Sequence, residues 1–90
     1  MASVGLPSML RGLAGGVSHV EVAAGTLGAA LDALGERYPA LERRLRDERG
    51  ALRRYVNFYV DGEECRRLAG PATPLQPHTE VVIIPSVAGG

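Results

Sequence analysis

The sequence predicts a small α+β domain in which a mixed sheet of four to five strands packs on one helix. Short stretches of alternating apolar and polar residues lie on both sides of a segment with helical spacing. Asp61-Gly62 is a dipeptide typical of a tight turn between two strands. The expected order is therefore β-β-α-β-β-β. A chain of 90 residues suffices for one modest core and leaves little room for a deep substrate cavity.

The first two strands are expected at residues 2–6 and 17–22, joined as a hairpin by a long, glycine-rich connection. Pro7 ends the first strand or places it at an edge. Residues 8–16 are interpreted as an extension of the apolar side that passes into a turn. Alternation predicts that four side chains of this hairpin face the core, namely Val4, Leu6, Val20 and Val22.

The helix is expected to follow Thr26, whose side chain suits the N-cap position. Apolar residues recur on one helical stripe, at Leu27, Leu31, Leu34 and Tyr38. Pro39 is expected to end the helix, because the residue before a proline is disfavoured in the α region. The charged residues 40–53 are predicted to form a short helical turn and then a loop, with Leu41, Leu45 and Leu52 as apolar anchors.

The strongest strand pattern is residues 55–60, followed by the Asp61-Gly62 turn and a short edge strand at residues 63–67. A proline-rich connection, from which Leu75 is expected to reach the core, leads to the last strand at residues 80–84. Alternation places Val56, Phe58, Val60, Val81 and Ile83 in the core. The same alternation leaves Asn57, Tyr59, Val82 and Ile84 on the outer face.

Composition excludes several classes of function. Ten arginines balance ten acids and there is no lysine, so no overall charge favours nucleic acid or an anionic membrane. The single cysteine, Cys65, excludes an internal disulfide and fits a reducing compartment. There is neither an apolar run long enough to span a membrane nor a signal-peptide pattern, so we expect a cytoplasmic protein. No metal site is expected, because His19 and His78 have no carboxylate at a suitable spacing.

The C-terminal segment is the most unusual feature. Pro85 ends the last strand, and Ser86, Val87, Ala88, Gly89 and Gly90 come after it. A frayed end is one interpretation. The other is that residues 1–85 form the domain and residues 86–90 form a flexible tail whose terminal carboxylate enters another protein's active site. Five extended residues reach at most about 17 Å, and the two glycines keep that thread thin.

This order of elements and the terminal Gly-Gly resemble the ubiquitin-like β-grasp sulfur carriers of molybdopterin, thiamin and cysteine biosynthesis. The resemblance rests on Thr26-Leu27, on the segment from Val56 to Glu63, and on the tail from Val81 to Gly90. The Val-Asn-x-Tyr-Val segment and the ending Pro-Ser-Val-Ala-Gly-Gly are most similar to the actinobacterial carrier of cysteine biosynthesis. The arginine-rich connection at residues 42–54 and Cys65 depart from the family pattern.

The resemblance implies a protein co-substrate rather than an enzyme. An E1-like adenylyltransferase/sulfurtransferase would use ATP to activate the Gly90 carboxylate, and a sulfur donor would convert it to a thiocarboxylate. A sulfur-accepting synthase would then take the sulfur. In cysteine synthesis a metallopeptidase would release the product. The carrier itself would bind no cofactor, and neither nucleic acid nor membrane is an expected partner.

Several alternatives stay open at this stage. The same tail suits a ubiquitin-like modifier conjugated through Gly90, the small subunit of molybdopterin synthase, or an inert β-grasp interaction module. Tyr59, Val82 and Ile84 are predicted to form an exposed apolar patch that contacts a partner. Cys65 is interpreted as a semi-buried thiol in an edge strand. The arginine-rich stretch is interpreted as a solvated loop, with docking to an acidic partner surface as the alternative, and the pathway that receives the sulfur is not encoded in any residue.

Overall fold

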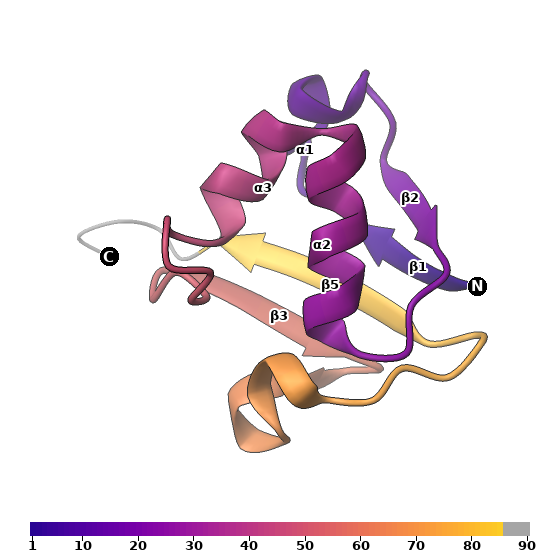
Figure 1. The fold of residues 1–90 in the computed structure, drawn as a ribbon. Coiled ribbons are helices and arrows are strands. Elements are labelled where there is room, and N and C mark those ends of the chain that lie inside the picture. The colour runs from indigo at the N-terminus through magenta and orange to yellow at the C-terminus, as the bar shows by residue number, and fades with distance from the viewer. Residues whose placement is uncertain (86–90) are drawn as a thin grey trace.

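The last strand of the chain lies at the centre of the sheet. Residues 1–85, which the computed structural model describes, form five strands, three α-helices and three short 3-10 helices (Figure 1). Their bounds are β1 (Ala2–Gly5), α1 (Ser8–Arg11), η1 (Gly12–Ala14), β2 (His19–Val22), α2 (Leu27–Arg37), α3 (Pro39–Leu45), β3 (Val56–Val60), β4 (Glu63–Glu64), η2 (Cys65–Arg67), η3 (Gly70–Ala72) and β5 (Glu80–Pro85).

The sheet is mixed and has the strand order β2-β1-β5-β3-β4. β1 and β2 form the predicted antiparallel hairpin, and so do β3 and β4. β5 joins the two hairpins, because it pairs parallel with β1 and antiparallel with β3. Asp61 and Gly62 have φ angles of 49° and 88°, the left-handed conformation that the predicted tight turn requires.

The predicted helix is α2, which lies across one face of the sheet (Figure 1). The Thr26 hydroxyl accepts a hydrogen bond from the Ala29 N–H at 3.1 Å, which confirms Thr26 as the N-cap. The helix ends at Arg37, because Tyr38 leaves the helical conformation before Pro39. Its buried side chains are Leu27, Ala30, Leu31 and Leu34, and Tyr38 is partly buried against the same core.

The core lies between this helical layer and the inner face of the sheet. The strand residues assigned to it by alternation are all buried, and Phe58 is among its largest fully buried side chains. Leu75 is also buried, as predicted. Its N–H donates to the Gly25 carbonyl at 2.9 Å, and this hydrogen bond anchors the proline-rich connection.

The connection between β1 and β2 differs from the prediction. Residues 8–14 form helical turns, α1 and η1, rather than an extended apolar stretch and a turn. Leu10 and Ala14 are buried whereas Gly12, which would share their face in a strand, is exposed, and this pattern fits helical turns. The Arg11 side chain donates through Nε to the Leu6 carbonyl at 3.0 Å and fixes the start of this connection.

The helical layer contains more than the one helix predicted. Pro39 opens α3 as well as closing α2, since a proline is well suited to the first turn of a helix. Leu41 and Leu45, one turn apart, are both fully buried. The predicted short helical turn is thus a seven-residue helix that packs beside α2.

The predicted return strand at residues 63–67 is also wrong beyond its first two residues. β4 contains only Glu63 and Glu64, and the chain then turns into η2. This turn carries Cys65 into the core, where it is fully buried, instead of leaving it on an edge strand. The Glu64 carboxylate accepts from the Arg66 N–H at 3.3 Å, which favours the helical turn over an extended strand.

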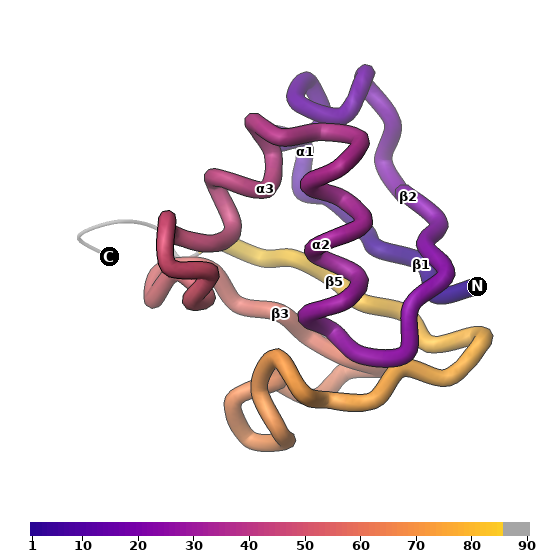
Figure 2. Tube along the Cα trace, viewed as in Figure 1, coloured from indigo at the N-terminus to yellow at the C-terminus, as the bar shows by residue number. Residues whose placement is uncertain are grey.

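The connection from α3 to β3 runs beside the end of β5, as the tube in Figure 2 shows. Val56, the first residue of β3, pairs with Pro85, the last of β5. The arginine-rich residues that precede β3 therefore lie next to the point where the described chain ends. Across residues 1–85 there is no helix of the length and apolarity that a membrane span needs.

Candidate functional site

The end of β5 is paired with the start of β3. β5 has a strand on each side, so its backbone is paired with β1 at Ser3, Val4 and Gly5 and with β3 from Val60 back to Val56. Pro85 is consequently held by the β3 ladder. Of the predicted site residues, Ser86, Val87, Ala88, Gly89 and Gly90 lie outside the described residues. The structure describes residues 1–85, which precede them in the chain.

The outer face of β5 carries the predicted apolar patch. Val82 lies between Gly5 on β1 and Tyr59 on β3, its partners in the two ladders. Ile84 is paired with Asn57 and is 47% exposed, whereas Val82 and Tyr59 are partly buried. The alternation that put these three side chains outside is confirmed. Their contact with a partner stays a prediction.

A groove beside this patch was not predicted. It has a volume of about 290 Å³ and is lined by Leu6, Pro7, Arg11, His19, Val82 and Ile84, among others. Gly5 is also part of its lining, and the His19 ring lies close over it: a Cβ on Gly5 would meet His19 Nε2 at 3.3 Å. A glycine inside a strand pattern is the sequence signal that points to such a close approach. The groove extends the apolar surface from Ile84 toward β2.

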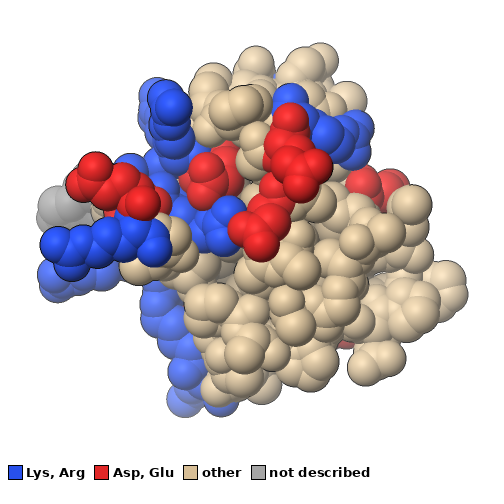
Figure 3. All heavy atoms as spheres, in the orientation of Figure 1, with Lys and Arg blue, Asp and Glu red and all other residues tan. Residues whose placement is uncertain are grey.

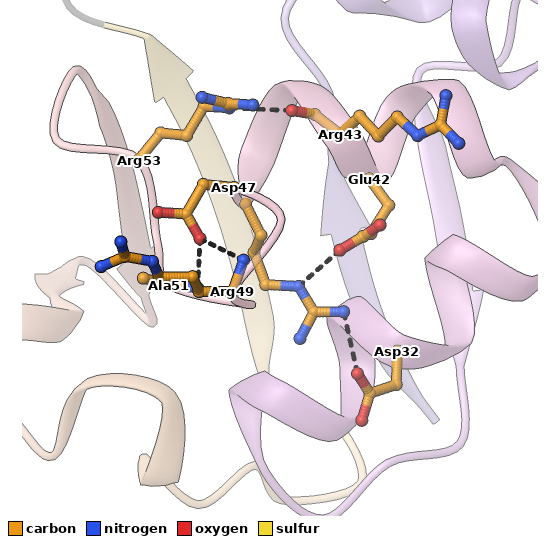
Figure 4. A network of polar contacts seen from close by, with 8 residues as sticks. Asp32, Glu42, Arg43, Asp47, Arg49, Ala51 and Arg53 are labelled. Carbon is orange, nitrogen blue, oxygen red and sulfur yellow. Dashed lines mark hydrogen bonds and ion pairs between the residues drawn. The ribbon is translucent and has the colours of Figure 1, made fainter.

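Arginine side chains gather on the side of the molecule where β5 ends, as comparison of Figures 1 and 3 shows. Residues 42–54 are more ordered than a solvated loop. Gly50 N–H donates to the Asp47 carbonyl and Asp47 N–H donates to the Ala51 carbonyl, both at 2.9 Å. The Asp47 carboxylate in turn accepts from the N–H groups of Arg49 and Ala51 at 2.9 and 3.0 Å (Figure 4).

These contacts also set the electrostatics of the loop. The hydrogen bond from Ala51 is the main cause that lowers the pKa of Asp47, and Arg49 and Arg53 act in the same direction.

Arg46 is the internal anchor: its guanidinium contacts Asp32 and Glu42, each at 2.8 Å, and ties α3 to α2 (Figure 4).

Cys65 lies in the core, in surroundings that disfavour the thiolate. Burial is the main cause that raises the pKa of its thiol to about 11, and the neighbouring Glu64 carboxylate raises it further. The reactive form of cysteine is the thiolate, so a thiol with this pKa is a poor nucleophile at neutral pH. The thiol was expected to be semi-buried in an edge strand, and it is instead fully buried in η2.

The features described so far are surfaces formed by the sheet and its connections. Among residues 1–85, no group of three His, Cys, Asp or Glu side chains is arranged to hold a metal ion. The body offers a fixed strand end, an apolar outer face, a groove and a basic margin. Such an arrangement suits a protein that presents a segment to another protein.

Comparison with known proteins agrees with this geometry. The ThiS family matches residues 4–90. The sulfur carrier protein CysO of Mycobacterium tuberculosis is 39% identical over 90 residues, covering 98% of this chain and 97% of the relative. Its crystal structure superposes with a TM-score of 0.89 at 36% identity, covering 97% of this chain and 100% of that chain.

Two further structures are similar over almost their whole length. The Amycolatopsis orientalis BexX/CysO complex contains a chain with a TM-score of 0.92 and 31% identity, with 100% of both chains covered. The small archaeal modifier protein 1 of Methanosarcina acetivorans has a TM-score of 0.84 and 29% identity, with 99% of this chain and 95% of that chain covered. The fold is thus the ubiquitin-like β-grasp, as the resemblance predicted.

Proposed function

The chain belongs to the ThiS family and is a sulfur carrier protein, a protein substrate of partner enzymes rather than an enzyme, and from this premise we propose how it carries sulfur. The reactive group is the carboxylate of Gly90. The observation that carries this proposal is the extent of the family match, which runs through residue 90 and so includes Gly89-Gly90.

The proposed chemistry has two steps. In the first, a carboxylate oxygen of Gly90 attacks the α-phosphorus of ATP and releases pyrophosphate, which leaves an acyl-adenylate. In the second, a sulfide or a persulfide attacks the acyl carbon. If the donor is a persulfide, a thiol afterwards reduces the S–S bond of the resulting acyl disulfide. AMP leaves with the former carboxylate oxygen, and the product is a thiocarboxylate. A carboxylate is ionised at neutral pH, so it is a competent nucleophile but becomes an electrophile only after adenylation.

The activating partner in this proposal is an E1-like adenylyltransferase, which supplies the ATP site. In this proposal, the segment that enters the enzyme's active site before Gly90 consists of Ser86, Val87, Ala88 and Gly89. Five residues span at most about 17 Å when extended. Gly89 has no side chain, which keeps the segment narrow. Ordering such a segment costs on the order of 1–2 kcal/mol per residue. The outer-face residues Tyr59, Val82 and Ile84 are the proposed contacts that recover this free energy.

A second partner takes the sulfur. We propose a sulfur-accepting synthase, and for cysteine synthesis a metallopeptidase that removes the newly made residue from the C-terminus. A cytoplasmic location follows from the use of ATP in this proposal. The relative from Amycolatopsis orientalis was crystallised with BexX, which supports a stable complex between a carrier of this kind and a partner protein.

The proposal is tested by ATP–pyrophosphate exchange with the E1-like adenylyltransferase of the same organism, because exchange reports the acyl-adenylate directly. We expect the intact chain to support exchange and a chain lacking Gly90 to support none while keeping its circular dichroism spectrum. Addition of sulfide should then increase the mass of the protein by one oxygen-to-sulfur exchange. Exchange by a chain extended with alanine after Gly90 would contradict the assignment.

A ubiquitin-like modifier is the second candidate, because this chain resembles the small archaeal modifier protein 1 over nearly its full length. In that function Gly90 forms an isopeptide bond with a lysine of a target protein. The chain has no lysine of its own, so it cannot be its own side-chain target. Isolation of the tagged carrier from its host separates the two: a thiocarboxylate supports the carrier, and higher-mass conjugates that require Gly90 support the modifier.

A further inference from the structure

The charges of this chain are unevenly placed, although they cancel overall. Ten arginines balance ten acids in the whole sequence, yet residues 42–54 contain six of the arginines and three of the acids. The remainder of the chain is correspondingly acidic.

The fold brings this stretch to the end of β5. Arg54 is two residues before Val56, which is the ladder partner of Pro85. The side chain of Arg53 donates to the Arg43 carbonyl at 2.8 Å, so the backbone at the start of the stretch is held against its end, while the Arg43 side chain runs away from Arg53 along the surface (Figure 4). Arg66 joins them from η2, because its guanidinium donates to the Arg53 carbonyl at 2.9 Å.

Most of this charge is not neutralised within the described chain. Arg46 is paired with Asp32 and Glu42 and has only 13% of its side chain exposed, so its role is internal. In contrast, Arg43, Arg49 and Arg54 are exposed, and none of the three makes an ion pair with another of residues 1–85. We call Arg43, Arg49 and Arg54 the exit arginines.

Acidic residues gather at the opposite end of the same strand. Glu80 begins β5, and its N–H donates to the Asp61 carboxylate at 2.9 Å. Glu63 comes one residue after the Asp61-Gly62 turn, and Glu21 is paired with Ser3, the β1 neighbour of Glu80. β5 therefore runs from an acidic end to a basic end.

The acidic and basic ends of β5 are farther apart than the distance over which exposed charges interact at physiological ionic strength. Six strand residues span about 17 Å between their first and last Cα atoms, while the Debye length is about 8 Å at 0.15 M salt. A partner that approaches the Pro85 end therefore experiences mainly the arginines, and the acids at the other end are screened from it.

We propose that the exit arginines dock on an acidic protein surface around the entrance of the enzyme that activates Gly90. The proposal rests on the proposed function and adds the chemistry of the partner's surface. A cationic margin beside the end of β5, with acidic residues at the opposite end, orients the carrier so that the Pro85 end of β5 faces an acidic partner. Nucleic acid is the less suitable ligand, because no aromatic side chain is interleaved among the arginines of residues 42–54 and the exposed Tyr55 that follows them is a single ring.

The test is steady-state adenylation of the carrier by the E1-like adenylyltransferase of the same organism. Replacing all three exit arginines by glutamate (R43E/R49E/R54E) should raise the KM for the carrier about tenfold or more at low salt, with kcat unchanged, because steering acts on association. The triple lysine variant (R43K/R49K/R54K) keeps the charge and should retain the original KM. R37E is a matched control for the single reversals R43E, R49E and R54E, since Arg37 is an exposed arginine at the end of α2.

The outcomes separate this inference from the function it rests on. An original chain that is not adenylated contradicts the proposed function. If the original chain is adenylated and the triple glutamate variant has the same KM, only the docking inference fails. The inference also fails if R37E has the same effect as the single reversals, if the difference persists unchanged in 0.5 M salt, or if duplex DNA competes with the enzyme for the carrier.

Discussion

The two faces of β5 carry similar residues but differ in their surroundings. Val81 and Ile83 face the helices and are 0% and 1% exposed, whereas Ile84, the next residue, is 47% exposed. Both faces are apolar, but they have different roles. The inner face supplies the core, and the outer face, in the proposed function, supplies a contact for partners. A central strand suits this division, because its two ladders hold the backbone and leave the outer side chains available.

The most severe way to break the inner face is to remove its largest side chain. Phe58→Ala should lower the free energy of unfolding by about 3–5 kcal/mol, through lost burial and the cavity left behind. Tyr59→Ala, the neighbouring change on the outer face, should cost much less because Tyr59 is only partly buried. Urea denaturation of both variants measures the difference, and equal losses would contradict the assignment of the two faces.

A matched pair on β5 tests the same distinction within one residue type. Ile83→Ala should destabilise the fold by about 2–5 kcal/mol. Ile84→Ala should change stability by no more than about 0.5–1 kcal/mol, since its side chain is half exposed and surface changes have small effects. In the adenylation assay, Ile84→Ala is expected to raise the KM for the carrier. An unchanged KM would remove Ile84 from the proposed partner surface.

The buried thiol sharpens the comparison through pH. Burial raises the pKa of Cys65 from 9.0 to about 11, so the unfolded chain releases this proton first as pH rises. Cys65 therefore favours the fold fully below pH 9 and loses that contribution between pH 9 and 11, by up to about 3 kcal/mol at ~1.4 kcal/mol per pH unit. Denaturation across this range, with Cys65→Ala as the control, isolates the contribution of the thiol. An equal pH dependence in both chains would show that the thiol does not contribute.

The smallest expected effect concerns the helix that covers the inner face. Thr26→Ala removes the acceptor of the Ala29 N–H and should lower stability by about 1 kcal/mol. Thr26→Ser keeps a hydroxyl and should lose much less. Thermal unfolding of the two variants provides the measurement, and identical melting temperatures would indicate that the cap does not stabilise α2.

Periodicity predicted the parts of this fold whose pattern is local. The stripe of α2, its cap, and the alternation in β3 and β5 all depend on neighbours a few residues apart. The helical turns after β1 and the full length of α3 were missed, because prolines and glycines in those stretches indicate a break but do not specify the conformation beyond it. The strand predicted at residues 63–67 was too long, because a strand of only two residues, as β4 is, is too short to show an alternating pattern. The groove beside Gly5 was missed because its lining combines residues from β1, β2 and β5, which are far apart in the sequence.

The sequence by itself determined which residues are apolar on which face, where the main helix begins, and that the chain resembles carriers ending in Gly-Gly. These are properties of spacing and of motif. Only the tertiary structure decided that β5 is central and that the arginine-rich stretch lies beside its end. The pairings of β5 with Gly5 and Val56 join residues far apart in the chain. Such contacts are set by how all the elements pack at once, and no local pattern encodes them.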